Sequence, residues 1–220
     1  MTLASCDSRK TAGENPFFTE WDTPHGVPPF DKILPEHFMP AFERGMSLHE
    51  AEIDAITSNK DEATFENTIL AYDNAGQMLA QTELVFGMLC AAETNDRMQA
   101  LQEQAMPLLA AHRDKIRLDD KLFVRVKEVY DRRAALGLDA EQMRLLQKTY
   151  DSFVRAGALL GAEQKARLKE INGQLSLTAV KFGNNILAEN NNFVLELKSD
   201  ELDGLPAGIR DAAREKAQQM

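Results

Sequence analysis

Apolar side chains recur every three or four residues along most of the chain, from Pro35 to about Asn190. This spacing places them on one face of a helix and predicts a mainly all-α fold, an antiparallel, bundle-like array of long helices. The expected helices cover residues 35–56, 64–93, 95–117, 120–136, 139–160 and 162–188. Pro107 is expected to kink one of them near Glu103, because proline has no backbone N–H and clashes with the preceding turn.

Several residues mark where these helices begin and end. Thr64 is suited to cap the helix that follows it, and Asp139 with Gln142 forms an approximate capping box. Gly137 is a fitting C-terminal cap. Gly157 lies within the apolar stripe of the predicted helix 139–160, where glycine costs about 1 kcal/mol relative to alanine. We expect the close approach of another backbone to compensate for it.

The last thirty residues follow a different pattern. Phe193–Leu197 is the one convincing strand, and residues 202–206 resemble a turn. A single strand cannot satisfy its own hydrogen bonds, and the helix that begins at Ile209 has no capping signal at its end. Together these features predict a truncated chain. The expected organisation is a leader over residues 1–16, a helical domain over 17–190 and the start of a further subdomain over 191–220.

Residues 1–16 are small and polar and predict a flexible leader. Leu3-Ala4-Ser5-Cys6 resembles a bacterial lipobox, in which the cysteine is lipidated, although the charged and apolar parts of a signal peptide are missing before it. With Cys6 lipidated the protein would be a cell-envelope lipoprotein, and otherwise it would be cytoplasmic. Prolines and aromatic residues follow up to Pro35, and Trp21 is expected to anchor this segment on the helices.

The composition is that of a folded globular protein, with 44% hydrophobic and 27% charged residues. No apolar run approaches the ~18 residues of a transmembrane segment. The net charge of −10 argues against nucleic acid as a partner, because the phosphate backbone is also negative. The charge is concentrated in residues 1–100, which hold 6 basic and 17 acidic side chains. A solvated acidic surface explains this, and the alternative is a surface that biases which peptides or partners approach.

The residue types that carry chemistry do not form a known catalytic pattern. His49-Glu50 begins an H-E-x-x-H zinc motif, but residue 53 is isoleucine, so we expect His49 to be a surface histidine. His112 lies on an apolar stripe and is expected to be a buried or half-buried histidine. Cys90 is expected to be a small buried hydrophobe rather than a nucleophile. The sequence therefore predicts no catalytic residue, metal ligand or cofactor in this chain, and it identifies no substrate-binding residue.

Several short segments, taken in order, resemble the N-terminal region of the thimet-oligopeptidase-type zinc metallopeptidases, and most closely the peptidyl-dipeptidase branch. The segments are Pro29–Ile33, Pro35–Phe38, Pro40–Phe42, Glu52–Ile56, Thr64–Ile69, Ala92–Asp96, Leu122–Val126, Phe153–Ala158 and Leu202–Pro206. The likeness covers about residues 15–206. The Phe153–Ala158 segment favours the peptidyl-dipeptidase branch over the endopeptidase branches.

The resemblance implies a mostly helical, two-lobed enzyme that cleaves short unstructured peptides and releases dipeptides from their C-termini. It implies one zinc ion held by H-E-x-x-H and a downstream glutamate. All of these residues would lie outside this chain. The helices of this chain would cover the substrate channel. The implied partners are the missing catalytic lobe and, for the whole enzyme, short peptides. The chain alone is expected to be inactive and to expose apolar surface. The alternative is a stand-alone all-α binding or scaffold module derived from such a peptidase.

Overall fold

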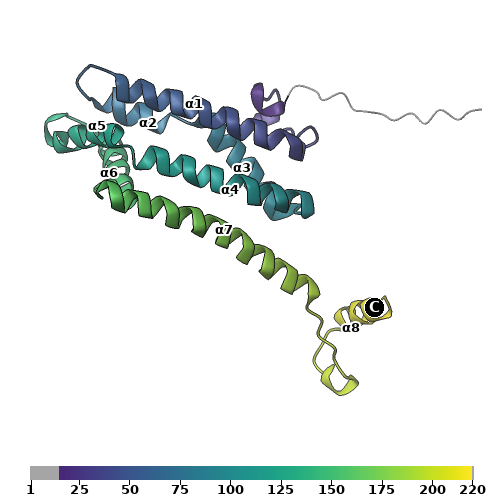
Figure 1. Cartoon of the computed structure of the whole chain (residues 1–220). Helices are drawn as coiled ribbons and strands as arrows, with labels where there is room; N and C mark the ends of the chain where they lie inside the picture. The colour runs from purple at the N-terminus through teal and green to yellow at the C-terminus, as the bar shows by residue number, and fades with distance from the viewer. Residues whose placement is uncertain (1–14, 220) are drawn as a thin grey trace, which may run out of the picture. The chain divides into compact units, whose positions relative to one another are not determined.

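A computed structural model of the chain describes residues 15–219. Within these residues the secondary structure is helical, without strand or sheet, which confirms the all-α expectation. The α-helices are α1 (Phe38–Ser58), α2 (Ala71–Asp73), α3 (Gln77–Ala92), α4 (Asp96–Arg117), α5 (Asp120–Asp131), α6 (Ala140–Arg155), α7 (Ala162–Asn192) and α8 (Ala207–Gln218) (Figure 1). The shorter turns are η1 (Pro16–Phe18), η2 (Pro24–Gly26), η3 (Pro35–His37), the π-helix η4 (Phe65–Leu70), η5 (Arg133–Ala135) and η6 (Ser199–Glu201).

The described residues divide into two compact units, one ending at Lys181 and one beginning at Phe182. In the first unit α1 packs against both α3 and α4, and α5 packs against α6 and η4. None of the helices in residues 15–219 is both long and apolar enough to cross a membrane.

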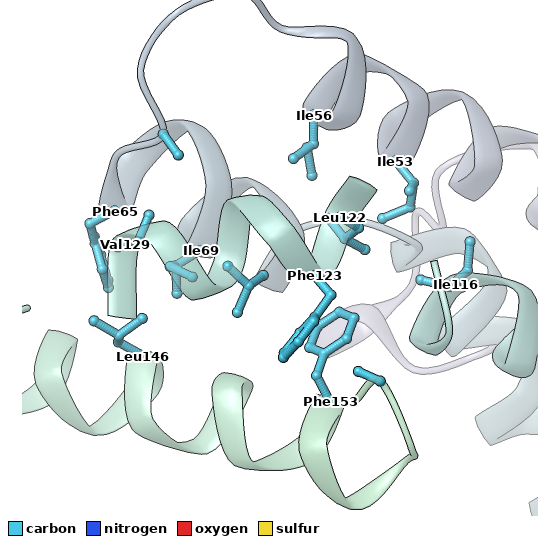
Figure 2. Close-up of a cluster of buried hydrophobic side chains, with 13 residues drawn as sticks. Ile53, Ile56, Phe65, Ile69, Ile116, Leu122, Phe123, Val129, Leu146 and Phe153 are labelled. Carbon is cyan, nitrogen blue, oxygen red and sulfur yellow. The ribbon is translucent and has the colours of Figure 1, made fainter. Parts of the chain in front are cut away.

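Two separate hydrophobic cores stabilise the first unit. The α5/α6 core, shown in Figure 2, joins the end of α1 to η4, α5 and α6 around Ile53, Ile56, Phe65, Ile69, Leu122, Phe123, Val129, Leu146 and Phe153. The α3/α4 core joins the N-terminal segment to the start of α1, α3 and α4 around Phe17, Ile33, Phe38, Phe42, Leu79, Phe86, Met98 and Leu109. Burial of this much aliphatic and aromatic surface is the main favourable term in folding.

The proline-rich segment before α1 is attached to the α3/α4 core. Phe17 is buried and contacts the ring of Phe38, with ring centroids 5.3 Å apart. The Trp21 indole lies beside Phe17 and donates from Nε1 to the carbonyl of Pro16 at 2.8 Å. Trp21 is therefore the expected anchor, with its polar edge satisfied by the backbone.

The helix predicted over residues 64–93 is wrong in one respect, because it is interrupted. Thr64 caps its start as expected, with Oγ1 accepting from the amide of Asn67 at 3.1 Å. The chain then forms a π-helical turn, the short α2 and a turn at Gly76, whose φ of 75° lies in the left-handed region. A glycine adopts this conformation at little cost, so it ends one helix and begins α3 at a new angle.

The Asp139–Gln142 capping box is confirmed. The Asp139 carboxylate accepts from the backbone N–H of Gln142 at 2.8 Å, and the side-chain Oε1 of Gln142 accepts from the backbone N–H of Asp139 at 3.1 Å. The helix was expected to continue to Leu160, but α6 ends at Arg155. Gly157 has a φ of 97° and lies beyond the helix. A Cβ atom there would lie 2.8 Å from a Leu168 methyl group, so a side chain, and not the expected backbone, approaches it.

The predicted strand at Phe193–Leu197 is not formed, and residues 193–198 are neither helix nor strand. A strand needs a partner for its hydrogen bonds, and residues 15–219 provide none. The helix expected from Ile209 is present as α8. Cys6 and nearly all of the predicted leader lie outside the described residues.

A buried arginine that the sequence analysis did not single out joins α5 to η4 and to the segment between α1 and η4. Arg125 on α5 donates to the carbonyl oxygens of Asn59 and Asp61 at 3.1 and 3.2 Å. It also donates to Oδ1 of Asn67 at 3.1 Å, the same oxygen that accepts from Thr64. The guanidinium thereby satisfies two backbone carbonyls of the connection that follows α1.

Candidate functional site

Two histidines from distant parts of the sequence meet between the two cores. Nδ1 of His49 on α1 lies 3.0 Å from Nε2 of His112 on α4. On α1 His49 falls between Phe42 of the α3/α4 core and Ile53 of the α5/α6 core, and on α4 His112 falls between residues of the same two cores. We call His49, Glu50, Glu52, His112 and Lys115 the histidine junction.

The junction also includes charged groups. Glu50 Oε2 accepts from Lys115 Nζ at 2.8 Å, and Glu50 Oε1 lies 3.5 Å from Nδ1 of His112. A neutral His49 that donates from Nδ1 to Nε2 of His112 leaves the proton of His112 on Nδ1, facing the carboxylate. The opposite tautomer would place a lone pair against a negative charge. The geometry therefore favours an arrangement in which His49 donates a hydrogen bond to His112 and the Nδ1–H group of His112 faces the Glu50 carboxylate.

The turn at Gly76 packs directly on this junction. Its amide donates to Oε2 of Glu52 at 2.7 Å, which ties the start of α3 to α1. A Cβ atom at Gly76 would lie 2.9 Å from Nδ1 of His49. Glycine is therefore required here both for its positive φ and for the space that the imidazole occupies.

Burial lowers the pKa of both imidazoles, His49 and His112. It lowers the pKa of His49, and the neighbouring His112 lowers it further. Burial also lowers the pKa of His112, against the opposing effect of the Glu50 carboxylate. The hydrogen bond from Lys115 keeps the pKa of Glu50 below its usual range. The lowered pKa values favour the uncharged form of both rings, and a hydrogen bond between two imidazoles needs at least one uncharged ring to accept it.

The structure corrects one expectation about these residues and confirms another. His49 was expected to be a surface histidine, but it is half-buried, because the contact with His112 comes from a helix 63 residues further along the chain. His112 is buried, with 5% of its surface exposed, as expected. Sequence periodicity placed each residue on its helix, but it holds no information about which helices become neighbours.

The histidine junction does not have the composition of a zinc centre. Ile53, at the position of the second histidine in H-E-x-x-H, is buried in the α5/α6 core. In residues 15–219 no three His, Cys, Asp or Glu side chains are arranged to hold a metal ion. Cys90 is half-buried against the α3/α4 core, and burial raises the pKa of its thiol, which disfavours the reactive thiolate.

A second feature is the exposed apolar face of α7. Its apolar residues share one side of the helix, since successive positions differ by about 100°. They are Leu168, Ile171, Leu175, Phe182 and Ile186. Leu175 and Phe182 are 62% and 64% exposed. Beside this row, Asn172 donates to Asp114 at 2.8 Å and Lys165 pairs with Asp120.

Sequence comparisons show which proteins the chain is similar to. No protein-family model matches the chain. The chain is 39% identical over 207 residues, 92% of its length, to a dipeptidyl carboxypeptidase of Escherichia coli. The chain is a homologue of the dipeptidyl carboxypeptidases. The predicted resemblance to the peptidyl-dipeptidase branch of the thimet-oligopeptidase-type peptidases is therefore confirmed.

Two further relatives agree with this assignment. The dipeptidyl carboxypeptidase of Salmonella typhimurium is 38% identical over 79% of the chain. The oligopeptidase A of Escherichia coli is more distant, at 24% identity over 89% of the chain. The chain spans 30%, 26% and 29% of the lengths of these three relatives.

Proposed function

We propose that these residues form the N-terminal, non-catalytic part of a longer zinc-dependent peptidyl-dipeptidase that releases dipeptides from the C-termini of short peptides. The observation that supports this most is the 39% identity to a dipeptidyl carboxypeptidase across 92% of the chain. Residues 15–219 hold no group of side chains suited to a metal ion. In this proposal the zinc ion and the residues that activate its water belong to the remaining part of the enzyme.

The exposed face of α7 is where we propose that the rest of the enzyme packs. A soluble protein seldom leaves such a row of large apolar side chains in water. The chain covers less than a third of its relatives' length, so a longer polypeptide has ample residues to cover the face. The first part of this face, Ile171 and Leu175, lies on the same helix that Lys165 and Asn172 tie to α4 and α5.

We further propose that these helices cover the substrate channel of the whole enzyme and restrict entry to unstructured oligopeptides. The two buried hydrophobic cores make the first unit close-packed, and a domain that limits access to a channel has to keep its shape. The negative charge of residues 1–100 would repel acidic peptides at long range, so it supports a preference for neutral or basic ones.

A stand-alone all-α scaffold derived from such a peptidase is the second candidate. The exposed apolar residues of α7 argue against it. A helical bundle that is stable alone buries the apolar face of each helix, as α6 does. The two candidates differ in what the gene encodes after Met220. A downstream H-E-x-x-H supports the enzyme, and a stop codon at that point supports the scaffold.

Peptide hydrolysis tests the proposal directly. The protein encoded by the complete gene is expected to release dipeptides from unstructured peptides in a chelator-sensitive reaction and to leave folded proteins intact. The 220-residue chain is expected to release none and to contain no stoichiometric zinc by elemental analysis. Chelator-sensitive hydrolysis by the 220-residue chain alone would contradict the proposal.

The α7 surface has its own test with a matched control. Leu175→Ser is expected to lower the melting temperature of the full-length enzyme but not that of the 220-residue chain, since the side chain is buried only in the former. Leu84 on α3 is 66% exposed and gives the control Leu84→Ser, which is expected to change neither. An unchanged melting temperature of the full-length Leu175→Ser enzyme would exclude this face as the contact.

A further inference from the structure

A cavity between the end of α4 and one side of α6 is lined by an excess of positive charge. Its volume is about 470 Å³, within the range of small-ligand sites. Its charged lining residues are Arg117 of α4 and Arg144, Lys148, Asp151 and Arg155 of α6. The four from α6 follow each other at intervals of four, three and four residues, which places them on one face of the helix.

The four basic side chains of the cavity, three arginines and one lysine, are not neutralised by ion pairs among the described residues. In residues 15–219 some other basic groups do pair with carboxylates: Lys115 pairs with Glu50, and Lys165 pairs with Asp120. Arg117, Arg144, Lys148 and Arg155 form no ion pair within the same residues. The one acidic group of the cavity, Asp151, accepts a hydrogen bond from Gln147 at 2.9 Å.

An anion in the cavity would offset the repulsion between its positive side chains. Arg144 and Lys148 are four residues apart on α6, where like charges destabilise a helix by a few tenths of a kcal/mol. Arginine side chains present planar pairs of N–H donors that match the two oxygens of a carboxylate. Three arginines and a lysine around one cavity therefore have the chemistry of an anion site.

We propose that this cavity binds the C-terminal carboxylate of a short peptide. The choice of a carboxylate rests on the proposed function, because a peptidase that releases C-terminal dipeptides must accept peptides with a free terminal carboxylate. Ser152, which also lines the cavity, provides a hydroxyl group for the same ligand. Arg144, Lys148 and Arg155 are exposed in the structure, so the site is open to solvent.

Titration of the ¹⁵N-labelled 220-residue chain with N-acetyl-tetra-alanine, followed by NMR, tests the proposal. The free acid is expected to shift the amide resonances of residues 144–156 in a saturable way. The same peptide as its C-terminal amide is expected to bind at least ten-fold more weakly. Equal binding of acid and amide would overturn the proposal, and so would inorganic phosphate binding more tightly than the peptide, because the cavity would then be a phosphate site.

Variants separate a built site from general attraction by positive charge. Arg144→Gln combined with Arg155→Gln is expected to weaken binding of the acid at least ten-fold. Lys169→Gln combined with Lys181→Gln removes the same charge from exposed positions of α7 and is expected to leave binding unchanged. Equal loss in both variants would overturn the proposal. Absence of peptide binding would leave the peptidase assignment intact, since hydrolysis by the full-length protein tests that separately.

Discussion

The apolar stripes of α6 and α7 have the same spacing in the sequence but different fates in the structure. Leu146 and Phe153 of α6 are completely buried in the α5/α6 core, whereas Leu175 and Phe182 of α7 are more than 60% exposed. The α6 stripe meets η4 and α5, while α7 is held to its neighbours by polar side chains that lie beside its stripe. A stripe thus shows that a face is suited to be covered, but not which part of the polypeptide covers it.

The largest expected difference between the two helices is in the effect of removing an apolar side chain. Phe153→Ala leaves a cavity in a closed core and is expected to lower the free energy of unfolding by about 3–5 kcal/mol. Leu175→Ala in the 220-residue chain is expected to change it by less than about 0.5 kcal/mol. Urea unfolding followed by circular dichroism measures both. Similar losses for the two variants would mean that the α7 face is covered within this chain.

Two glycines, one between α6 and α7 and one inside α7, are expected to give smaller effects of opposite sign. Gly157→Ala is expected to cost about 1–3 kcal/mol, because φ is 97° and the new methyl group would lie 2.9 Å from a Leu160 methyl group. Gly173 lies inside α7 with free space around it, so Gly173→Ala is expected to stabilise the chain by up to about 1 kcal/mol. The same urea measurement applies, and a stabilising Gly157→Ala would contradict this account of the connection.

The histidine junction sharpens the comparison, because α1 and α4 are joined by a pair of imidazoles, whereas α7 is joined to α4 and α5 by amide, carboxylate and ammonium groups. Both imidazoles have a pKa below 6.5 in the folded chain, so the unfolded chain binds protons first as the pH falls. The stability that the pair contributes is complete above about pH 6.5 and is lost as the pH falls through the lowered pKa values.

Replacement of both histidines tests this pH dependence. His49→Gln combined with His112→Gln is expected to flatten the change in unfolding free energy between pH 7.5 and pH 5.5. His25 is exposed, and His25→Asn is the matched control that keeps the original slope. An unchanged slope in the double variant would show that other groups carry the acid sensitivity.

Local structure was largely predictable from sequence. The capping residues Thr64 and Asp139 start their helices as expected, since a cap depends on a side chain and an amide three residues apart. The interruption at Gly76 and the early end of α6 before Gly157 were missed. Apolar periodicity continues through both glycines, so the pattern contains no sign that either residue adopts a positive φ.

The candidate site depended on contacts between distant residues and was largely hidden. The sequence separates His49 from His112 by 63 residues, and Arg117 from Arg155 by 38. Each of these residues looked ordinary on its own helix. A periodic signal could have shown the α6 row of Arg144, Lys148 and Arg155, but not the arrival of Arg117 from α4 that completes the cavity.

By itself the sequence determined the all-helical class, the positions of the apolar stripes and the kinship with the peptidyl-dipeptidases, because these depend on residue order and local geometry. The tertiary structure decided which stripes are buried, which histidines pair and which cations share a cavity. These outcomes depend on how helices pack, and packing is decided by the shapes of surfaces far apart in the chain.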